Sequence, residues 1–222
     1  MRNAASQSSS FTLAIAPGVP SPLFSALLAI QRAQEPEVVI KLSEVSGDEL
    51  MEGLREGRYD AGMSLRGSAD PSFSSQPLWC ESMAAALPPR FPLLGKTKLT
   101  ISDLLEYPVF LWQAEVSPVL AQHMSTVLPE QQNRIEYVTS FEMMALWVAA
   151  GYGVGVSAQS RIARAHAWDL SMRPLSDGLY QVITYLLRPT EQSNAAAERF
   201  DHRARQVART GVAQSLPEGQ SS

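Results

Sequence analysis

Hydrophobic and polar residues follow one another along this chain in an order that predicts a parallel α/β sheet. A strand-like apolar run over residues 38–42 precedes an amphipathic stretch over residues 46–56. The sequence Gly-x-x-Asp-Ala-Gly over residues 57–62 then leads into a short apolar strand. Gly57 can end the helix because glycine tolerates a positive φ. Strand, helix, turn and strand in this order indicate the winding of a parallel sheet.

The first third of the chain predicts a βαβαβ unit. Ser21-Pro22 matches a helix N-cap followed by proline at the first helical position. Ser46 and Glu49 have the spacing of a capping box. The strands are expected over residues 11–16, 38–42 and 60–64, and the helices over residues 22–33 and 46–56.

A second set of similar elements follows a predicted loop over residues 71–76. Ser117-Pro118 repeats the cap-plus-proline signal, and Thr139 with Glu142 repeats the capping-box spacing. Strands are expected over residues 79–87, 109–112, 135–138, 154–156 and 180–187. Helices are expected over residues 100–105, 117–127, 140–150, 160–165 and 195–208.

Composition agrees with a globular protein and argues against a general affinity for nucleic acid. The 222 residues are 45% hydrophobic and 18% charged, with a formal net charge of −4 and no run rich in lysine and arginine. The one cysteine, Cys80, cannot form an internal disulfide, which favours a cytoplasmic protein; its place in an apolar strand predicts an inert buried thiol.

The ends of the chain and its longest uncharged run give no sign of export or membrane insertion. The start is polar and serine-rich, without the apolar core of a signal peptide. Residues 143–160 are uncharged but interrupted by glycines, so we do not expect them to span a bilayer. Residues 1–10 are expected to be a disordered linker or remnant, and residues 209–222 a disordered tail.

No cluster of residues predicts catalysis, a metal or a cofactor. His123, His166 and His202 lack metal-ligand spacing and a cysteine partner. The sequence has no phosphate-binding loop, nucleophile elbow or paired-carboxylate signature. We therefore expect a receptor for a small molecule that is not an enzyme, with no metal and no cofactor.

Several segments, in this order and spacing, make the chain resemble the effector-binding domain of LysR-type transcriptional regulators. The resemblance covers about residues 11–208, and no single piece is specific by itself. The segments are Phe11-Thr-Leu-Ala-Ile-Ala16, Glu44 with residues 46–50, Leu54-Arg-Glu-Gly-Arg-Tyr-Asp-Ala-Gly-Met63, Gln76-Pro-Leu-Trp-Cys-Glu81, Phe91-Pro-Leu93 and Val148-Ala-Ala-Gly-Tyr-Gly-Val-Gly-Val156.

This resemblance implies an α/β fold with two Rossmann-like lobes joined by two crossover strands, similar to a type II periplasmic binding protein. Lobe I would comprise residues 11–82 and 180–208, and lobe II residues 83–179. The family also has an N-terminal helix-turn-helix, which we do not expect in this chain. DNA would then be bound only through that missing part of a full-length parent. The family further implies a homodimer, with a tetramer open for the parent.

We expect the effector site in the cleft between the lobes, at residues that follow predicted strands. Helix N-termini there offer N–H groups and serines offer hydroxyls, which favours a carboxylate or another polar small molecule. The plain alternatives are helix caps for the serines, a solvated charge for Arg66, and an exposed or structural role for Glu115. The candidates are Gly18, Val19, Pro20, Ser21, Ser46, Gly47, Ser64, Leu65, Arg66, Gln113, Ala114, Glu115, Ser140 and Phe141.

Two helices carry wide apolar faces that could serve a partner as well as their own sheets. One face contains Leu23, Phe24, Leu27, Leu28 and Ile30, and the other contains Val119, Leu120, Met124 and Leu128. In the family the corresponding helices meet head-to-tail across a two-fold axis.

Two functions remain as alternatives to regulation: a solute-binding protein for transport, and an enzyme on the same scaffold. The first needs an export signal and the second an acid or base in the cleft.

Overall fold

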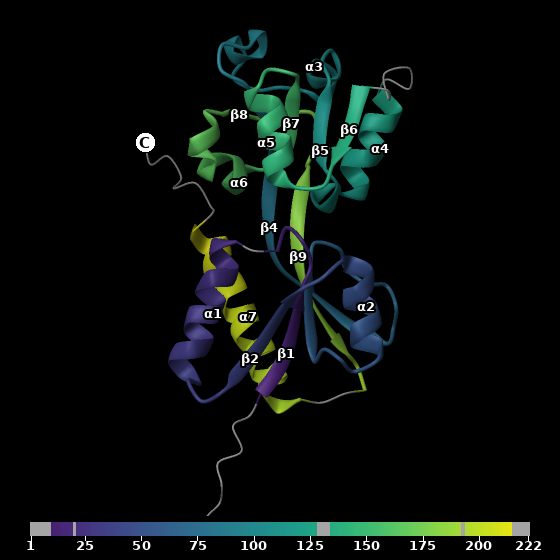
Figure 1. Ribbon diagram of the computed structural model, residues 1–222, viewed down its shortest axis with the longest axis vertical. Helices are drawn as coiled ribbons and strands as arrows, with labels where there is room; N and C mark the ends of the chain where they lie inside the picture. Colours follow the sequence, from purple (N-terminus) through teal and green to yellow (C-terminus); the bar gives the residue numbers. More distant parts are fainter. Residues whose placement is uncertain (1–9, 20, 128–133, 192–193, 215–222) are drawn as a thin grey trace, which may run out of the picture. The chain divides into compact units, whose positions relative to one another are not determined.

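The computed structural model describes four stretches of the chain, which fall into two compact units (Figure 1). Unit 1 consists of the residues up to Trp79 together with those from Ile183 onward, and unit 2 is Cys80–Val182. The described residues are 10–19, 21–127, 134–191 and 194–214, with side chains of the last helix as far as Arg209.

Two long strands, β4 (Phe73–Leu87) and β9 (Gln181–Pro189), contribute residues to both units. The expected lobe boundaries, after residue 82 and before residue 180, fall within or beside these strands. Such strands carry the chain out of unit 1 and back into it.

Unit 1 is built on a sheet in the order β2–β1–β3–β9, in which β1 is parallel to both of its neighbours and β9 is antiparallel to β3. Phe200 of α7 meets Phe11 of β1 with 5.1 Å between ring centroids, and α7 also packs against α1 (Figure 1). In chain order the other elements are β1 (Ser10–Ile15), α1 (Pro22–Gln34), β2 (Val39–Glu44), α2 (Gly47–Arg55), β3 (Ala61–Ser64) and α7 (Ala195–Gln214).

Unit 2 repeats this plan with the order β6–β5–β7–β4–β8. Strand β5 is parallel to β6 and β7, whereas β4 is antiparallel to β7 and β8. The elements are η1 (Pro92–Gly95), α3 (Ile101–Leu105), β5 (Val109–Trp112), η2 (Gln113–Glu115), α4 (Pro118–Val127), β6 (Ile135–Val138), α5 (Phe141–Ala149), β7 (Val154–Ala158), α6 (Gln159–Arg164), η4 (His166–Trp168) and β8 (Ser171–Pro174).

The turn between α2 and β3 is fixed by a glycine and a carboxylate. Gly57 has φ +72°, a conformation that other residues rarely adopt, and so allows the chain to leave the helix. The Asp60 carboxylate accepts hydrogen bonds from the Thr12 backbone N–H at 2.7 Å and from the Thr12 hydroxyl at 2.9 Å. Asp60 therefore ties the beginning of β3 to β1.

Helix starts agree with the sequence in most places, and the capping residue differs at α5. Ser21 and Ser46 cap α1 and α2 by accepting the N–H of Phe24 and Glu49. At α5 a capping box was predicted from Thr139, but the cap is Ser140, which was also interpreted as a cap and accepts the Met143 N–H. A reciprocal capping box forms instead at α3, where Thr100 and Asp103 bond to each other's backbone N–H groups.

Strand and tail boundaries differ further. Strand β4 begins at Phe73, so the loop predicted over residues 71–76 was wrong beyond its first residues. Strand β8 was not predicted. Helix α7 continues to Gln214, so residues 209–214 are helical rather than tail, whereas residues 1–9 and 215–222 lie outside the described residues.

The α/β fold class is confirmed by these two sheets with their covering helices. Among the described residues, no helix is long and apolar enough to cross a membrane.

We expect Asp60→Ala to lower the free energy of unfolding by about 2–3 kcal/mol, because two hydrogen bonds to a charged acceptor are lost and the Thr12 N–H is left without its partner. Asp60→Asn, which keeps one acceptor oxygen, should lose less. Urea unfolding measures both. The control Glu37→Ala removes an exposed carboxylate and should change stability by less than about 0.5 kcal/mol. Equal losses for Asp60→Ala and Glu37→Ala would contradict this role.

Candidate functional site

The parallel strands of unit 1 bring most of its candidate residues to one edge. Gly18 and Val19 follow β1, Ser46 follows β2, and residues 64–66 end and follow β3. Carboxyl ends of parallel strands meet at one edge, where ligands usually bind in α/β sheets. Val19 is 1% exposed and belongs to the core, so its side chain is not available to a ligand. Pro20 lies outside the described residues.

The serines at this edge already have structural partners. Ser21 and Ser46 are N-caps, and the Ser64 hydroxyl accepts the Arg66 N–H at 3.0 Å. Each oxygen therefore accepts a backbone hydrogen bond, while its own hydrogen can still be donated. Arg66 is exposed, which agrees with its interpretation as a solvated charge. This edge thus offers hydroxyl donors and one guanidinium from a loop.

Unit 2 brings its candidates to an edge of the same kind. Residues 113–115 form η2 directly after β5, and Ser140 and Phe141 follow β6. The Ser140 hydroxyl accepts the Met143 N–H at 3.1 Å, and Phe141 is 7% exposed. The indole of Trp112 donates to the Thr139 carbonyl at 3.0 Å, which fixes the ring at the end of β5.

Glu115 was a candidate ligand contact, but its carboxylate is directed into unit 2. One oxygen accepts the Arg161 Nε–H at 2.8 Å; the other accepts the Ala158 N–H at 3.2 Å and the Ser157 hydroxyl. The Glu115 side chain is 1% exposed, whereas that of Arg161 is 23% exposed. Burial of a carboxylate is tolerated when it is paired and hydrogen-bonded in this way. The structural interpretation of Glu115 therefore fits these contacts better than a role as ligand contact.

Sequence reasoning missed Arg161 at this edge. Its guanidinium carbon lies 4.9 Å from the ring centroid of Trp112 and 5.8 Å from that of Phe141. Arg161 belongs to α6, which begins directly after β7, the other parallel neighbour of β5. The rule that pointed to residues after β5 and β6 would have found it if it had been applied to β7.

A second polar cluster in unit 2 joins three elements and contains none of the candidates. Tyr180 shares a hydrogen bond with His123 Nδ1, and Asp177 accepts the Ile101 N–H at 2.7 Å. Burial, followed by the nearby charge of Asp177, raises the pKa of Tyr180 far above its usual value. The cluster connects α3, α4 and the segment before β9. Among the described residues, no group of three or more His, Cys, Asp or Glu side chains could hold a metal ion.

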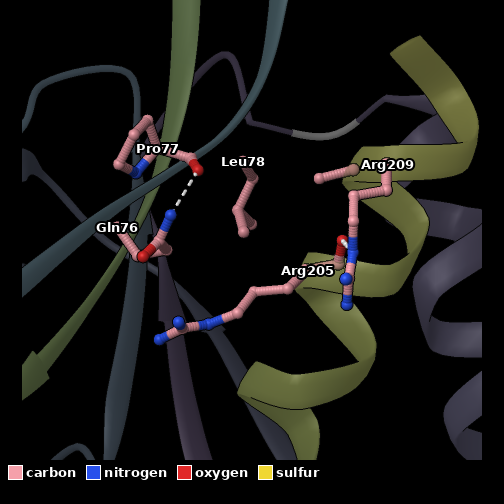
Figure 2. A pocket seen from close by; sticks show the side chains of 6 residues that line it. Gln76, Pro77, Leu78, Arg205 and Arg209 are labelled. Carbon is pink, nitrogen blue, oxygen red and sulfur yellow. Dashed lines mark hydrogen bonds between the residues drawn. The ribbon is translucent and has the colours of Figure 1, made fainter. Parts of the chain in front are cut away.

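Unit 1 also contains a hollow of about 580 Å³ between the first part of β4 and α7 (Figure 2). Arg205 extends from α7 toward Gln76 (Figure 2). Its guanidinium also forms a bidentate pair with Asp201 at 2.8 and 2.9 Å. The residues that line the hollow are Gln76, Pro77, Leu78, Arg205, Ala208 and Arg209. None of them was a candidate, so this hollow is separate from the edges described above.

Cys80 was expected to be buried, and this was wrong. Trp79 is 4% exposed, but Cys80 is an exposed residue because successive side chains of a strand point to opposite faces. Partial burial of the thiol, followed by the charge of Glu81, nevertheless raises the pKa of Cys80.

Comparison with known proteins identifies relatives across nearly the whole chain. Residues 4–209 match the family of the LysR substrate binding domain. The HTH-type transcriptional regulator BenM of Acinetobacter baylyi is 24% identical over 160 residues, which are 70% of this chain and 52% of that protein. A probable cat1 operon transcriptional activator of Acinetobacter lwoffii is 29% identical over 167 residues, 72% of this chain and 54% of that protein. The chain thus spans about half the length of these relatives.

Solved structures share the fold. The BenM effector binding domain with its effector benzoate has a TM-score of 0.78 and 20% identity, over 96% of this chain and 98% of that chain. The effector binding domain of QuiR in complex with shikimate has a TM-score of 0.74 and 14% identity, over 91% and 98%. These likenesses establish the two-sheet fold of the chain as the one seen in effector-binding domains.

We expect the Cys80 thiol to be alkylated more slowly in the folded protein than in urea at the same neutral pH. A raised pKa leaves less thiolate, the reactive form, and the rate should climb as the pH rises toward that pKa. Iodoacetamide labelling followed by mass spectrometry measures the rates. Glu81→Gln removes the second cause of the shift and should speed the folded reaction. A folded protein that reacts faster than the unfolded chain would contradict the prediction.

Proposed function

Because the chain belongs to the LysR substrate-binding domain family, we propose that it senses a small polar or anionic effector and relays its binding to a DNA-binding part of a longer bacterial regulator. The observation that carries the proposal is the family match over residues 4–209. The relatives BenM and the cat1 activator are named as transcriptional regulators, which favours regulation over transport or catalysis. The proposed location is the cytoplasm, where DNA is.

The effector site is proposed at the two sheet edges. In unit 1 the donors are the hydroxyls of Ser21, Ser46 and Ser64. In unit 2 they are the polar groups around Ser140 and residues 113–114. Polar groups in this arrangement suit a small molecule with a carboxylate, since backbone N–H groups and hydroxyls both donate to it. BenM binds benzoate and QuiR binds shikimate in the structures named above, and both ligands fit this class.

The proposed mechanism is a difference in affinity between two conformations. An effector that binds one arrangement of the regulator more tightly shifts the population toward it by the ratio of the two affinities. No covalent step is needed. Enzymatic catalysis is not proposed, because Glu115, the acid among the candidate residues, is engaged in structural hydrogen bonds.

We also propose that the chain forms a homodimer through its outer strands and the helices beside them. The edge strands β2 and β6 expose Val39, Leu42 and Tyr137, and α4 exposes Val119 at 58%. Phe24 and Leu27 of α1, and Leu120 of α4, are buried in their own units and are not available to a partner. Leu128 lies outside the described residues. DNA binding and a tetramer are proposals for the longer parent alone.

Removing the hydroxyl at the proposed site should weaken effector binding. A calorimetric screen of small carboxylic acids, with benzoate and shikimate included, first identifies a ligand. We expect Ser46→Ala and Ser140→Ala to lower its affinity several-fold, because each loses a donor, and to lower stability by about 1 kcal/mol through the lost cap.

Ser117→Ala is the matched control for the caps. Ser117 caps α4 by accepting the Leu120 N–H at 3.3 Å but is not a candidate site residue. It should cost similar stability and leave affinity unchanged. Equal affinity losses in all three variants would assign the effect to helix capping. The absence of any ligand in a broad metabolite screen would count against the sensing function itself.

The dimer predicts a mass of two 24.2 kDa chains by light scattering at micromolar concentration. Val119→Glu places a charge on the exposed face of α4 and should shift the protein toward monomer without altering its circular dichroism. Glu142→Lys, at an exposed position of α5, is the control and should remain dimeric. A monomeric wild-type protein would rule out the dimer.

A further inference from the structure

We propose that Arg161 binds the carboxylate of the effector in unit 2, and that Glu115 is the positioning residue that holds its guanidinium. This inference rests on the proposed function, since it concerns the same sheet edge. It changes the chemistry assigned to that edge: a fixed guanidinium, rather than helix N–H groups and hydroxyls alone, selects the anion. The ligand class it names is a planar carboxylic acid with an apolar body.

Three chain segments converge on the guanidinium. Trp112 is the last residue of β5, Phe141 is the first residue of α5 after β6, and Arg161 lies in α6 after β7. The three strands are parallel neighbours, so their carboxyl ends meet. The distances of 4.9 and 5.8 Å from the guanidinium carbon to the two ring centroids are those of cation–π contacts. The charge is therefore held among apolar groups at the ligand-facing edge.

The ion pair is buried at its acidic end and reaches solvent at its basic end. Glu115 has both oxygens engaged by donors of unit 2, and its side chain is 1% exposed. Arg161 is 23% exposed. A carboxylate placed only to neutralise an arginine could lie anywhere near the charge. The Glu115 carboxylate is held in place by hydrogen bonds from the Ser157 hydroxyl and the Ala158 N–H. Because it accepts the Arg161 Nε–H from this fixed position, it sets the orientation of the guanidinium plane.

The orientation decides which ligand fits. A guanidinium has five N–H donors in a rigid plane, and a carboxylate matches two of them side by side. Trp112 and Phe141, each 7% exposed, offer apolar surface beside that plane. A planar acid with an apolar body can pair with the guanidinium while its body lies against the rings. An uncharged amide of the same shape gains the apolar contact but loses the charge-assisted bonds.

The test compares acids with their own amides. Benzoate, nicotinate and cinnamate, each beside its amide, are titrated by calorimetry into the wild-type protein, Arg161→Met and Arg161→Lys. We expect at least one acid to bind the wild-type protein about ten-fold more tightly than its amide, since hydrogen bonds between charged groups are worth about that factor. Arg161→Met should abolish this preference while changing amide affinity little, and Arg161→Lys should retain part of it. The control is Arg164→Met. Arg164 is an exposed arginine one helical turn after Arg161 that donates to Ser160, and its loss should leave the preference for acids unchanged.

Removing Arg161 leaves the buried Glu115 carboxylate without its cationic partner, so Arg161→Met can fail to fold. The double variant Glu115→Gln with Arg161→Met removes that charge and supplies a folded protein for the same titration. Glu115→Ala tests positioning: it keeps Arg161 but should reduce the preference for acids over amides, and Glu115→Gln, which keeps an acceptor for Nε, should restore it. A purely structural Glu115 would lower stability and leave that ratio unchanged.

Two results overturn the proposal: no acid preferred over its amide by the wild-type protein, or a preference that survives in the folded variants without Arg161. If uncharged ligands bind and their affinity depends on Ser46 and Ser140, the sensing function is supported and the role of Arg161 is refuted.

Discussion

Parallel pairing of short strands is the constraint on which the arrangement of this protein depends. In each unit a central strand, β1 or β5, lies between two parallel neighbours. Parallel strands need a crossover helix between them, and the loops before these helices then gather at one edge. Residues separated by dozens of positions, such as Trp112 and Arg161, come within contact distance for this reason.

That edge concentrates polar groups, and each must be satisfied. The N-terminal turns of α1, α2 and α5 leave N–H groups without helical partners, and a serine accepts one of them in each case. Residues that stabilise the fold therefore occupy the same positions as residues that would bind a ligand. One hydroxyl can do both, because its oxygen accepts from the helix while its hydrogen remains a donor.

The two members of the Glu115–Arg161 ion pair differ in burial, and this difference separates a structural carboxylate from a guanidinium proposed to bind the effector. Charges buried in a protein are retained when paired and hydrogen-bonded. The acid is enclosed by Ser157 and the Ala158 N–H, so its charge cannot serve a ligand. The base is partly exposed among aromatic rings, and for this reason it is the group proposed for recognition. The net charge of −4 gave no indication of such a local cation, since composition sums over the chain.

Sequence by itself determined the α/β fold class and the order of most elements, because apolar periodicity, glycine turns and N-cap serines act over a few neighbouring residues. The family was recognised from a resemblance carried by several segments in order. It located the caps at Ser21 and Ser46 and the turn at Asp60. Tertiary structure alone decided that β4 begins at Phe73, that Cys80 is exposed, and that Glu115 bonds to Arg161 rather than pointing to a ligand. The start of β4 depends on strand pairing, and the face of β4 that is buried depends on what packs against it. The Glu115–Arg161 pair joins residues 46 positions apart, and short-range pattern does not determine such contacts.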